Sequence, residues 1–349
     1  MKFKFMVGLI AVGLALGLYR VGAESLKENL QKKLSKSIGQ PVTIRGAYPL
    51  FPPALFLSGL EVGKPFDPME KPILSVAQLS IRVNFLKFLQ GQWGVEMELA
   101  NPKLFFTRDS QGVFNEAFLS LIKRRPVFPR SAVFLHRVRA RDGEIVFIDR
   151  RVSPETKWTV RNVSLSAGLD PKKKGYRFSL LALLDGAQPS ATLEFGGEMV
   201  LDETGKIKMA LTDWPAQKFA PYLRDILGVA PSQGICTIES VLILHKKMLT
   251  SSTTLVGRGL LFPGAEQTVF GLPGNKLIEL LKDKEGNVHL KFDVGGSLND
   301  STDWPSLIQE AFGESIHQAM TANLQNLLSD VEKKPVVDVI QNEGESLSR

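Results

Sequence analysis

The stretch "VEMELANPKLFFTRDSQGVFN", residues 95–115, carries the pattern that predicts the fold. Its first five residues alternate between apolar side chains and glutamates, which is the period of a strand with one apolar and one polar face. The pair Asn101-Pro102 then predicts a turn, and a second strand follows. The closing "RDSQG" belongs to a metal loop, an acid/base pair or a tight turn. Because an EF-hand needs acids at alternate positions and only Asp109 fits, we predict a turn at Asp109 and Gly112.

The same alternation recurs in residues 77–84, 206–211 and 287–296, and Gly, Pro, Asn and Asp separate such segments. This pattern predicts a mainly β chain whose antiparallel sheet has one wetted face. Regular strand–helix alternation is missing, which disfavours a doubly wound nucleotide-binding fold. The apolar faces would line a common groove or the core of a sandwich. The candidate groove residues are Leu79, Ile81, Val83, Leu290, Phe292 and Val294, with Ala77 expected on the same face as Leu79.

The N-terminus predicts a membrane-targeting segment. An apolar run over residues 5–19 lies between Lys4 and Arg20. A helix of this length spans about 22 Å, short of the ~30 Å hydrocarbon core, so flanking basic side chains would have to extend it. We expect an uncleaved anchor; the alternative is a signal peptide cut after Ala23. The predicted anchor positions are Phe5, Leu9, Val12, Leu16 and Tyr19.

The segment that follows is typical of an amphipathic helix. Leu26, Leu30, Leu34 and Ile38 recur every four residues, and lysines lie between them. This helix either rests on a lipid surface or caps a soluble core. The predicted organisation is an anchor (1–22), a membrane-proximal amphipathic helix (23–40), a β-rich domain (41–301) joined by a few connecting helices, a C-terminal helix (302–332) and a polar tail (333–349).

The net charge of +7 and the pI of about 9.3 favour acidic partners. Arg137, Arg139 and Arg141 alternate along one predicted strand and share a face, with Arg124 and Arg125 nearby in sequence. Such a row suits phosphate oxygens, so we predict a contact with phospholipid or another anionic lipid. The alternative is a solvated face balanced by acids of the same segment. Nucleic acid is disfavoured, because the targeting segment removes the chain from it and aromatic stacking motifs are missing.

No catalytic motif is found: the sequence lacks a GxSxG elbow, a P-loop, a dinucleotide fingerprint and HExxH. Its four histidines lie far apart, without metal-ligand spacing. The one cysteine, Cys236, falls in an apolar strand and is expected in the core. We therefore predict no catalytic residue, no metal and no cofactor, and a protein that is not an enzyme.

The first 115 residues resemble the AsmA-like family. The resemblance rests on "IGQPVTIRG", "LFPPALFLSGLEVG", the alternating strands before residue 100 and the "RDSQGVFN" close, with weaker likeness in "GEIVFIDRR", "ATLEFGGEMVL" and "GNVHLKFDVGGSLND". It implies a single-pass protein of the bacterial inner membrane with its body in the periplasm. It also implies an elongated, curved, taco-shaped β-groove.

The function implied by this resemblance is phospholipid binding or transport that supports outer-membrane assembly and the envelope, together with envelope protein partners. A structural or assembly factor without lipid cargo is the alternative. A secreted enzyme or carbohydrate binder is a third reading. No catalytic residue carries over, since the matching motifs belong to the scaffold.

Overall fold

The computed structural model divides the chain into a first unit, Met1–Leu211, and a second unit, Thr212–Arg349, which are described separately. The predicted anchor, the polar tail, Arg124 and Arg125 lie outside the described residues. The described residues are 22–50, 54–63, 71–84, 93–115, 133–170, 175–184, 191–200, 204–227, 230–262, 268–269, 272–298 and 304–332.

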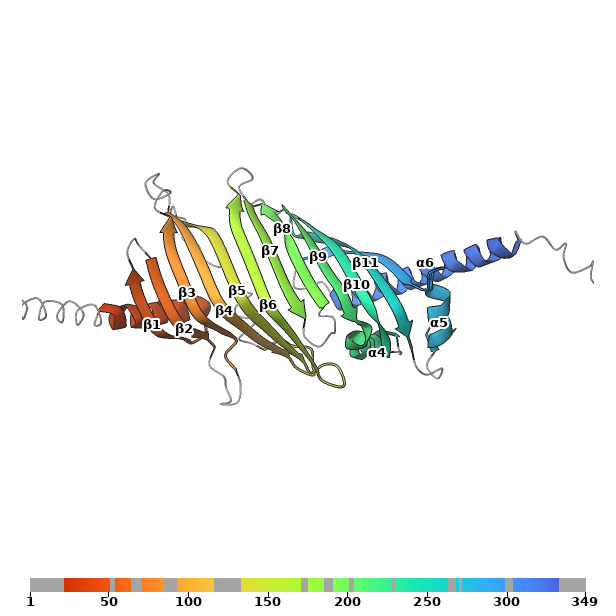
Figure 1. Ribbon diagram of the computed structural model, residues 1–349, viewed down its shortest axis with the longest axis horizontal. Helices are drawn as coiled ribbons and strands as arrows, with labels where there is room; N and C mark the ends of the chain where they lie inside the picture. The colour runs from red at the N-terminus through yellow and green to blue at the C-terminus, as the bar shows by residue number, and fades with distance from the viewer. Residues whose placement is uncertain are drawn as a thin grey trace, which may run out of the picture. The chain divides into compact units, whose positions relative to one another are not determined.

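The prediction of a mainly β chain with few helices is confirmed. Twelve of the described strands belong to the main sheet, and two more form a short ribbon. In the first unit the strands follow one another in sequence order, as Figure 1 shows for β1 to β8. They are β1 (Val42–Leu50), β2 (Ala54–Val62), β3 (Leu74–Asn84), β4 (Trp93–Arg108), β5 (Val133–Asp149), β6 (Thr156–Asp170), β7 (Gly175–Leu184), β8 (Ala191–Val200) and β9 (Thr204–Pro215), the last of which runs into the second unit.

One pair of strands departs from the predicted antiparallel order. β4 and β5 are parallel over their whole paired length, from Trp93 beside Val133 to Arg108 beside Asp149. The other registered pairs from β1 to β8 are antiparallel. A parallel pair needs a crossover connection of a dozen or more residues, and the long segment between Arg108 and Val133 supplies it. The sheet is therefore mixed, which the alternation of side chains alone cannot reveal.

A row of left-handed residues crosses the first unit's strands. We call it the kink row. Gly59 in β2, Asn101 in β4, Asp142 in β5 and Asn162 in β6 have φ values of 60°, 50°, 55° and 53°. The flanking registers place Gly59 opposite Ala77, Ala77 opposite Asn101, and Asn101 beside Asp142. Gly, Asn and Asp tolerate this conformation best, so their side-chain types locate the row. The predicted turn at Asn101-Pro102 is wrong, since β4 continues through it.

The kink row shifts the alternation of buried side chains by one residue. Where a strand crosses the kink row, successive buried residues of one core cluster are three positions apart instead of two. The pairs are Ile44 and Ala47, Leu57 and Leu60, and Val76 and Leu79. As a result Ala77 is exposed, whereas Val76 and Leu79 are buried. The expectation that Ala77 shares a face with Leu79 is therefore wrong, because strict period-two counting ignores the left-handed residues in the neighbouring strands.

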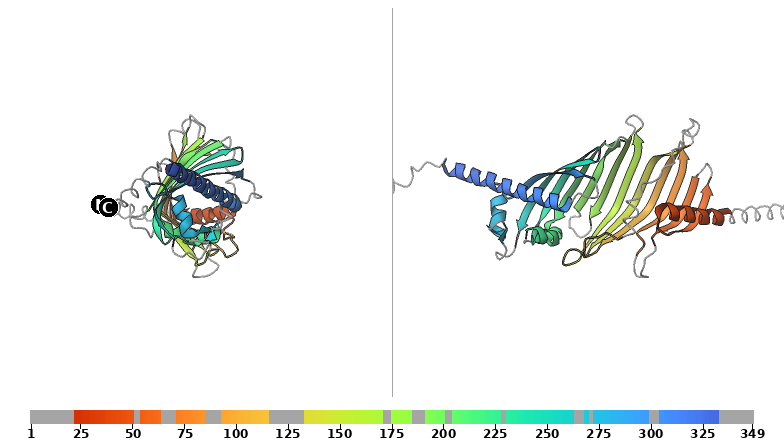
Figure 2. Two further views of the ribbon diagram at one scale, coloured as in Figure 1. Left: turned by 90° about the vertical axis from the view of Figure 1, so that its right-hand side faces the viewer. Right: turned by 180° about the vertical axis from the view of Figure 1, so that it is seen from behind.

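A helix over residues 22–38 covers the first strands (Figure 2, right). Leu30, Leu34 and Ile38 pack against the buried cluster of β1 to β3, as their four-residue spacing predicts. The Ser35 hydroxyl accepts a hydrogen bond of 2.9 Å from the Val42 N–H, which fixes the entry into β1. Of the two alternatives, the structure shows a helix that covers a core; its contact with a lipid surface stays a prediction.

The "RDSQG" stretch forms the predicted turn. The Asp109 carboxylate accepts hydrogen bonds from the Gln111 and Val113 N–H groups, both at 2.9 Å. Gly112, with φ of 85°, donates its N–H to the Asp109 carbonyl at 3.0 Å. A second turn at Asp283 repeats this bonding with Glu285, Gly286 and Asn287. In each turn one carboxylate oxygen accepts two backbone N–H groups, so the fold explains these acids as turn residues.

The second unit combines strands with helices. The strands β10, β11 and β14 are hydrogen-bonded in that order and antiparallel. A core cluster lies between them and residues of η1, α5 and α6. Of the helices in the described part of the chain, none combines the length and apolar character needed to cross a bilayer. The elements are η1 (Ala216–Phe219), α4 (Ala220–Leu227), β10 (Gln233–His245), β11 (Met248–Leu261), β12 (Thr268–Val269), β13 (Leu272–Pro273), α5 (Gly274–Leu281), β14 (Val288–Ser297) and α6 (Trp304–Glu332).

Candidate functional site

Two rows of apolar residues run across six strands of the first unit, from β3 to β8. Each row connects residues that are direct partners in neighbouring strands, so all its members lie on one face of the sheet. We call them the apolar rows. The first contains Leu79, Leu99, Ala140, Leu165, Leu180 and Phe195; the second contains Ile81, Met97, Val138, Ala167, Phe178 and Gly197.

The apolar rows change from covered to open along the sheet. Leu79 is 5% exposed and belongs to the cluster beneath helix 22–38. Leu165, Leu180 and Phe195 are half-buried, and the main described contacts of β6 and β7 are with neighbouring strands. Phe178 and Phe195 lie with ring centroids 5.5 Å apart. An apolar face therefore continues beyond the part that the helix covers.

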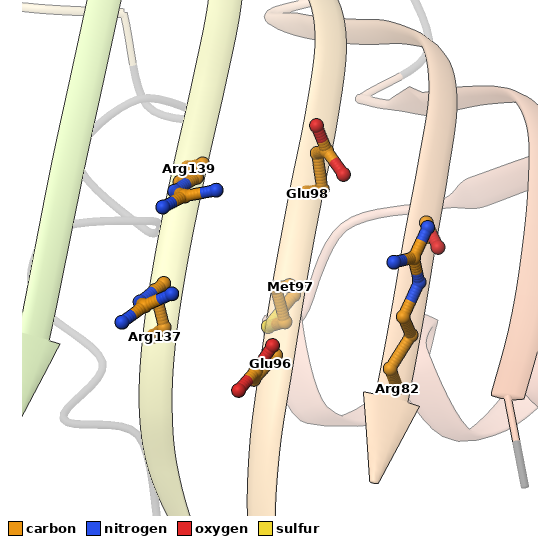
Figure 3. A pocket seen from close by; sticks show the side chains of 7 residues that line it. Arg82, Glu96, Met97, Glu98, Arg137 and Arg139 are labelled. Atoms are coloured by element: carbon orange, nitrogen blue, oxygen red, sulfur yellow. The ribbon is translucent and has the colours of Figure 1, made fainter. Parts of the chain in front are cut away.

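The opposite face of the same strands is charged. We call it the charged face. Arg82 of β3, Glu96 of β4 and Arg137 of β5 are direct partners in one row, and Ser80, Glu98 and Arg139 are partners in the next. Figure 3 shows these side chains around a shallow hollow of about 60 Å³. Side chains of opposite charge thus face one another across neighbouring strands, an arrangement that stabilises cross-strand pairs.

The predicted arginine row exists, and carboxylates of β4 face it. Arg141 forms an ion pair with Glu98. Glu96 accepts a hydrogen bond of 3.2 Å from Asn84 and lies 4.0 Å from His136 Nε2. Sequence reasoning sought the balancing acids within the arginine segment itself and missed these two glutamates. The signal was present as the polar half of "VEMEL", but the parallel pairing that brings β4 beside β5 could not be read from it.

The arginines and the apolar rows lie on opposite faces of one sheet. Arg139 and Ala140 are consecutive in β5, and consecutive side chains of a strand point to opposite faces. A lipid whose acyl chains lie on the apolar rows therefore cannot place its phosphate on Arg137 or Arg139 across the same strands. The lipid contact of the arginines stays a prediction, but it cannot share one molecule with the apolar rows at these positions.

A buried ion pair fastens the C-terminal ends of β4 and β5 to each other. Asp149 is 0% exposed, and its carboxylate accepts two hydrogen bonds from the Arg108 guanidinium, one of them 2.9 Å from Nε to Oδ1. The Arg151 N–H donates to the same oxygen at 3.1 Å. Strand ends are thus held in register by a charge-assisted, bidentate bond. We assign this pair to the scaffold, since the turn at Asp109 begins directly after it.

Three further groove candidates lie in the second unit. Val294 is buried on β14, and Phe292 contacts Phe312 of α6 edge-on, with ring centroids 5.7 Å apart. Leu290 is 5% exposed and lines an apolar cavity of about 120 Å³. Helices cover this face, so these residues lie in a closed core or at a cavity. In the first unit Val83 is half-buried on β3.

Sequence reasoning also missed the part of the apolar rows that lies beyond the cluster beneath helix 22–38. Phe178 and Leu180 of β7 and Phe195 of β8 were not singled out. In "GYRFSLLALL" the alternation is blurred, because Leu181 and Leu183 on the other face are apolar as well. Leu181 is 50% exposed. Cross-strand register, rather than any one strand's pattern, identifies these residues.

The described residues contain no arrangement for metal chemistry: within them, no group of three or more His, Cys, Asp or Glu side chains is placed to hold an ion. His289 lies 3.1 Å from the Asp283 carboxylate at the surface. Cys236 is 7% exposed, and burial raises the pKa of its thiol to about 11. A thiol with such a pKa is protonated at neutral pH and is a poor nucleophile. Neither a family model nor a curated protein matches the chain.

Proposed function

We propose that this protein is an AsmA-like envelope protein, anchored in the bacterial inner membrane with its body in the periplasm, that binds or conveys phospholipid. The proposal rests on the sequence resemblance, the basic charge and the N-terminal apolar run. The single observation that carries it is the pair of apolar rows, which continue past the covering helix onto β6, β7 and β8. In this proposal the sheet forms a curved groove and its apolar rows hold acyl chains.

The energetics favour an occupant for the open part of the rows. Apolar surface left in water costs about 25 cal/mol per Å² relative to burial. Contiguous apolar patches of more than a few hundred Å² are uncommon on soluble proteins and mark binding sites. An acyl chain needs only such a surface, without directed hydrogen bonds. Its head group would extend into solvent, since the charged face is on the other side.

The test compares two adjacent residues of β7 that point to opposite faces. Leu180→Asp places a carboxylate on the open apolar row, whereas Ser179→Asp places it on the charged face. We expect the protein purified without detergent to carry phospholipid, detected by native mass spectrometry and lipid extraction. Leu180→Asp should lower the bound phospholipid several-fold while the protein stays folded, and Ser179→Asp should leave the amount unchanged. Lipid-free wild-type protein, or equal loading of both variants, would contradict the proposal.

The position of the substitution matters because the covered ends of the rows are core. At Leu79 and Leu290, each 5% exposed, an aspartate would be buried without a partner and should unfold its unit. Loss of lipid in such a variant would say nothing about the site. Leu180 is half-buried, so water can reach a charge placed there.

The proposed location has a separate test. We expect the full chain to sediment with membranes and to need detergent for extraction, and a variant that lacks residues 1–22 to remain in the soluble fraction. A full-length chain that is soluble without detergent would contradict the anchor. This result would leave the lipid experiment interpretable, because that experiment measures binding by the β-rich region.

A further inference from the structure

The main sheet ends in two edge strands, β1 in the first unit and β14 in the second. An edge strand presents unpaired N–H and C=O groups, to which another strand can add. Side chains of helix 22–38 protect the edge of β1. The Val42 N–H donates to the Ser35 hydroxyl at 2.9 Å. The Ile44 N–H donates to the Gln31 side-chain carbonyl at 3.4 Å, and Pro49 further disfavours an added strand.

The edge of β14 carries none of these protections in the part of the chain that the structure describes. The strand is ten residues long, contains no proline and pairs with β11 without a bulge. Between described elements, the backbone hydrogen bonds of Lys291, Asp293 and Gly295 are limited to the ladder with β11. A long, regular edge of this kind is a site at which another strand can pair.

Hydrogen bonds at the two ends of β14 show which of its backbone groups point outward. Leu298, directly after the strand, donates its N–H to the Lys247 carbonyl beside β11 at 2.7 Å. Just before the strand, the Asn287 carbonyl accepts from the Asp283 N–H at 2.8 Å, on the side away from β11. Successive residues of a strand direct their backbone groups to opposite sides. The odd-numbered residues of β14, such as Lys291, therefore point their N–H and C=O groups outward.

The exposed charges of β14 complement those of a second copy of the same strand. Lys291 and Asp293 lie two residues apart on the exposed face, beside the uncharged Thr254 and Ser252 of β11. If two copies pair antiparallel with Phe292 opposite Phe292, Lys291 of each copy lies opposite Asp293 of the other. Opposite charges in direct cross-strand positions are favourable, and like charges are not. Two charges of one sign would guard this edge against self-pairing, whereas a lysine and an aspartate favour it.

The same register agrees with the direction of the backbone groups. Lys291 and Asp293 both point outward, so each pair of these residues can exchange two N–H···O=C bonds. Phe292 then falls in the closer, non-hydrogen-bonded position on the two-fold axis. Its ring is half-buried against Phe312, and the ring of the second copy would cover more of its remaining surface.

We propose that the second unit pairs with a second copy of this chain, β14 against β14 and antiparallel about Phe292. A two-fold interface of this kind uses the same edge of both copies and closes on itself, so the product is a dimer and not a fibre. One added pair of strands is a small interface, so dissociation constants of roughly 1–100 µM are expected. The proposal is independent of the phospholipid site, because it rests only on the second unit.

The test follows the oligomeric state of the full chain in detergent micelles by sedimentation velocity, from roughly 1 to 300 µM. The wild-type chain should change from monomer to dimer within this range. Asp293→Lys places two lysines opposite each other at both symmetric positions, and Lys291→Asp does the same with aspartates. Each variant should weaken the dimer about tenfold or more. The control Glu239→Lys makes the same charge change on the same face of the sheet, two strands from the edge, and should leave the dimer unchanged.

Exchange of the two charges tests the register. The double variant Lys291→Asp/Asp293→Lys should dimerise as the wild type does, because each lysine again faces an aspartate. An equimolar mixture of the two single variants should form heterodimers for the same reason, and native mass spectrometry separates these from homodimers by mass. Both positions are exposed, so the variants should keep the fold, which circular dichroism checks.

A wild-type chain that stays monomeric over the whole range would overturn the proposal. So would a dimer that Asp293→Lys leaves intact, since its interface would then lie elsewhere, or a failure of the double variant and the mixture to dimerise. Assembly beyond the dimer would contradict the two-fold interface. Phospholipid loading should be the same in every β14 variant, so the failure of either proposal leaves the other standing.

Discussion

The buried pair of Arg108 and Asp149 provides the sharpest test of how β4 and β5 are held together. We expect Asp149→Asn to destabilise the first unit by about 3 kcal/mol, at the lower end of the cost of breaking a buried ion pair. The lower end applies because the Arg108 side chain keeps 20% of its surface in contact with solvent, while Asp149 is fully buried. The substitution keeps the size of the side chain and removes its charge. The Arg108 guanidinium then loses its partner.

The assay is urea unfolding, with Glu198→Gln as the matched control. Glu198 pairs with Arg177 at 2.8 Å, but 39% and 64% of the two side chains are exposed. Such surface pairs contribute about 0–1 kcal/mol. The double variant Arg108→Met/Asp149→Leu should recover much of the loss, since it leaves no unpaired charge. If Asp149→Asn cost no more than Glu198→Gln, the assignment of this pair to the scaffold would be refuted.

Three further predictions concern the turns and the cysteine. Because burial raises the pKa of the Cys236 thiol to about 11, its thiolate absorbance should appear near that pH, and titration near 9.0 would contradict the buried position. The pKa of the Asp283 carboxyl lies below its usual value, mainly because the Asn287 N–H donates a hydrogen bond to it. Partial desolvation raises this pKa, and the Glu285 N–H and His289 lower it further. This carboxyl therefore stabilises the fold above its unfolded pKa of about 3.9, and the contribution is lost as the pH falls through the folded pKa. Asp283→Asn should lower the urea midpoint at neutral pH and leave it unchanged at strongly acidic pH. An equal loss at both pH values would contradict a stabilising role for the ionised carboxylate. Gly112→Ala and Gly286→Ala should each cost about 1 kcal/mol in the same assay, because both glycines have positive φ. Since a Cβ at Gly286 meets open space, an unchanged stability there would show that the backbone strain is unimportant.

The sequence predicted those parts of the fold that depend on neighbouring residues in the chain. Alternation identified strands, the spacing of Leu30, Leu34 and Ile38 identified a helical face, and Asp109 with Gly112 identified a turn. Each signal is local, because side-chain period and turn chemistry are properties of a few consecutive residues. The C-terminal helix was also found, as a long apolar periodic segment.

The parts that were missed depend on pairing between distant segments. Nothing within "VEMEL" indicates that β5 lies beside it in parallel, so the partners of Arg137 and Arg141 could not be named. The same holds for the hydrogen-bonded hydroxyls of Ser240, Ser251 and Thr253, which belong to two strands and look like ordinary polar residues in sequence. The cavity beside Cys236 arises where helices and strands meet, and no single strand's pattern encodes it.

The kink row explains why strict alternation failed in the first unit and why the sheet nevertheless keeps one apolar face. A one-residue shift in a single strand would turn half of its apolar side chains toward solvent. Here the shift falls at the same level in neighbouring strands, so buried residues remain paired on both sides of it. Leu57 pairs with Leu79 on one side of the kink row, and Leu60 pairs with Val76 on the other. The left-handed residues Asn101 and Asp142, adjacent across the parallel pair, keep this correspondence in β4 and β5. An asparagine or aspartate inside an alternating strand therefore marks a change of face when neighbouring strands carry one at the same level. The apolar rows remain continuous because these strands change face together.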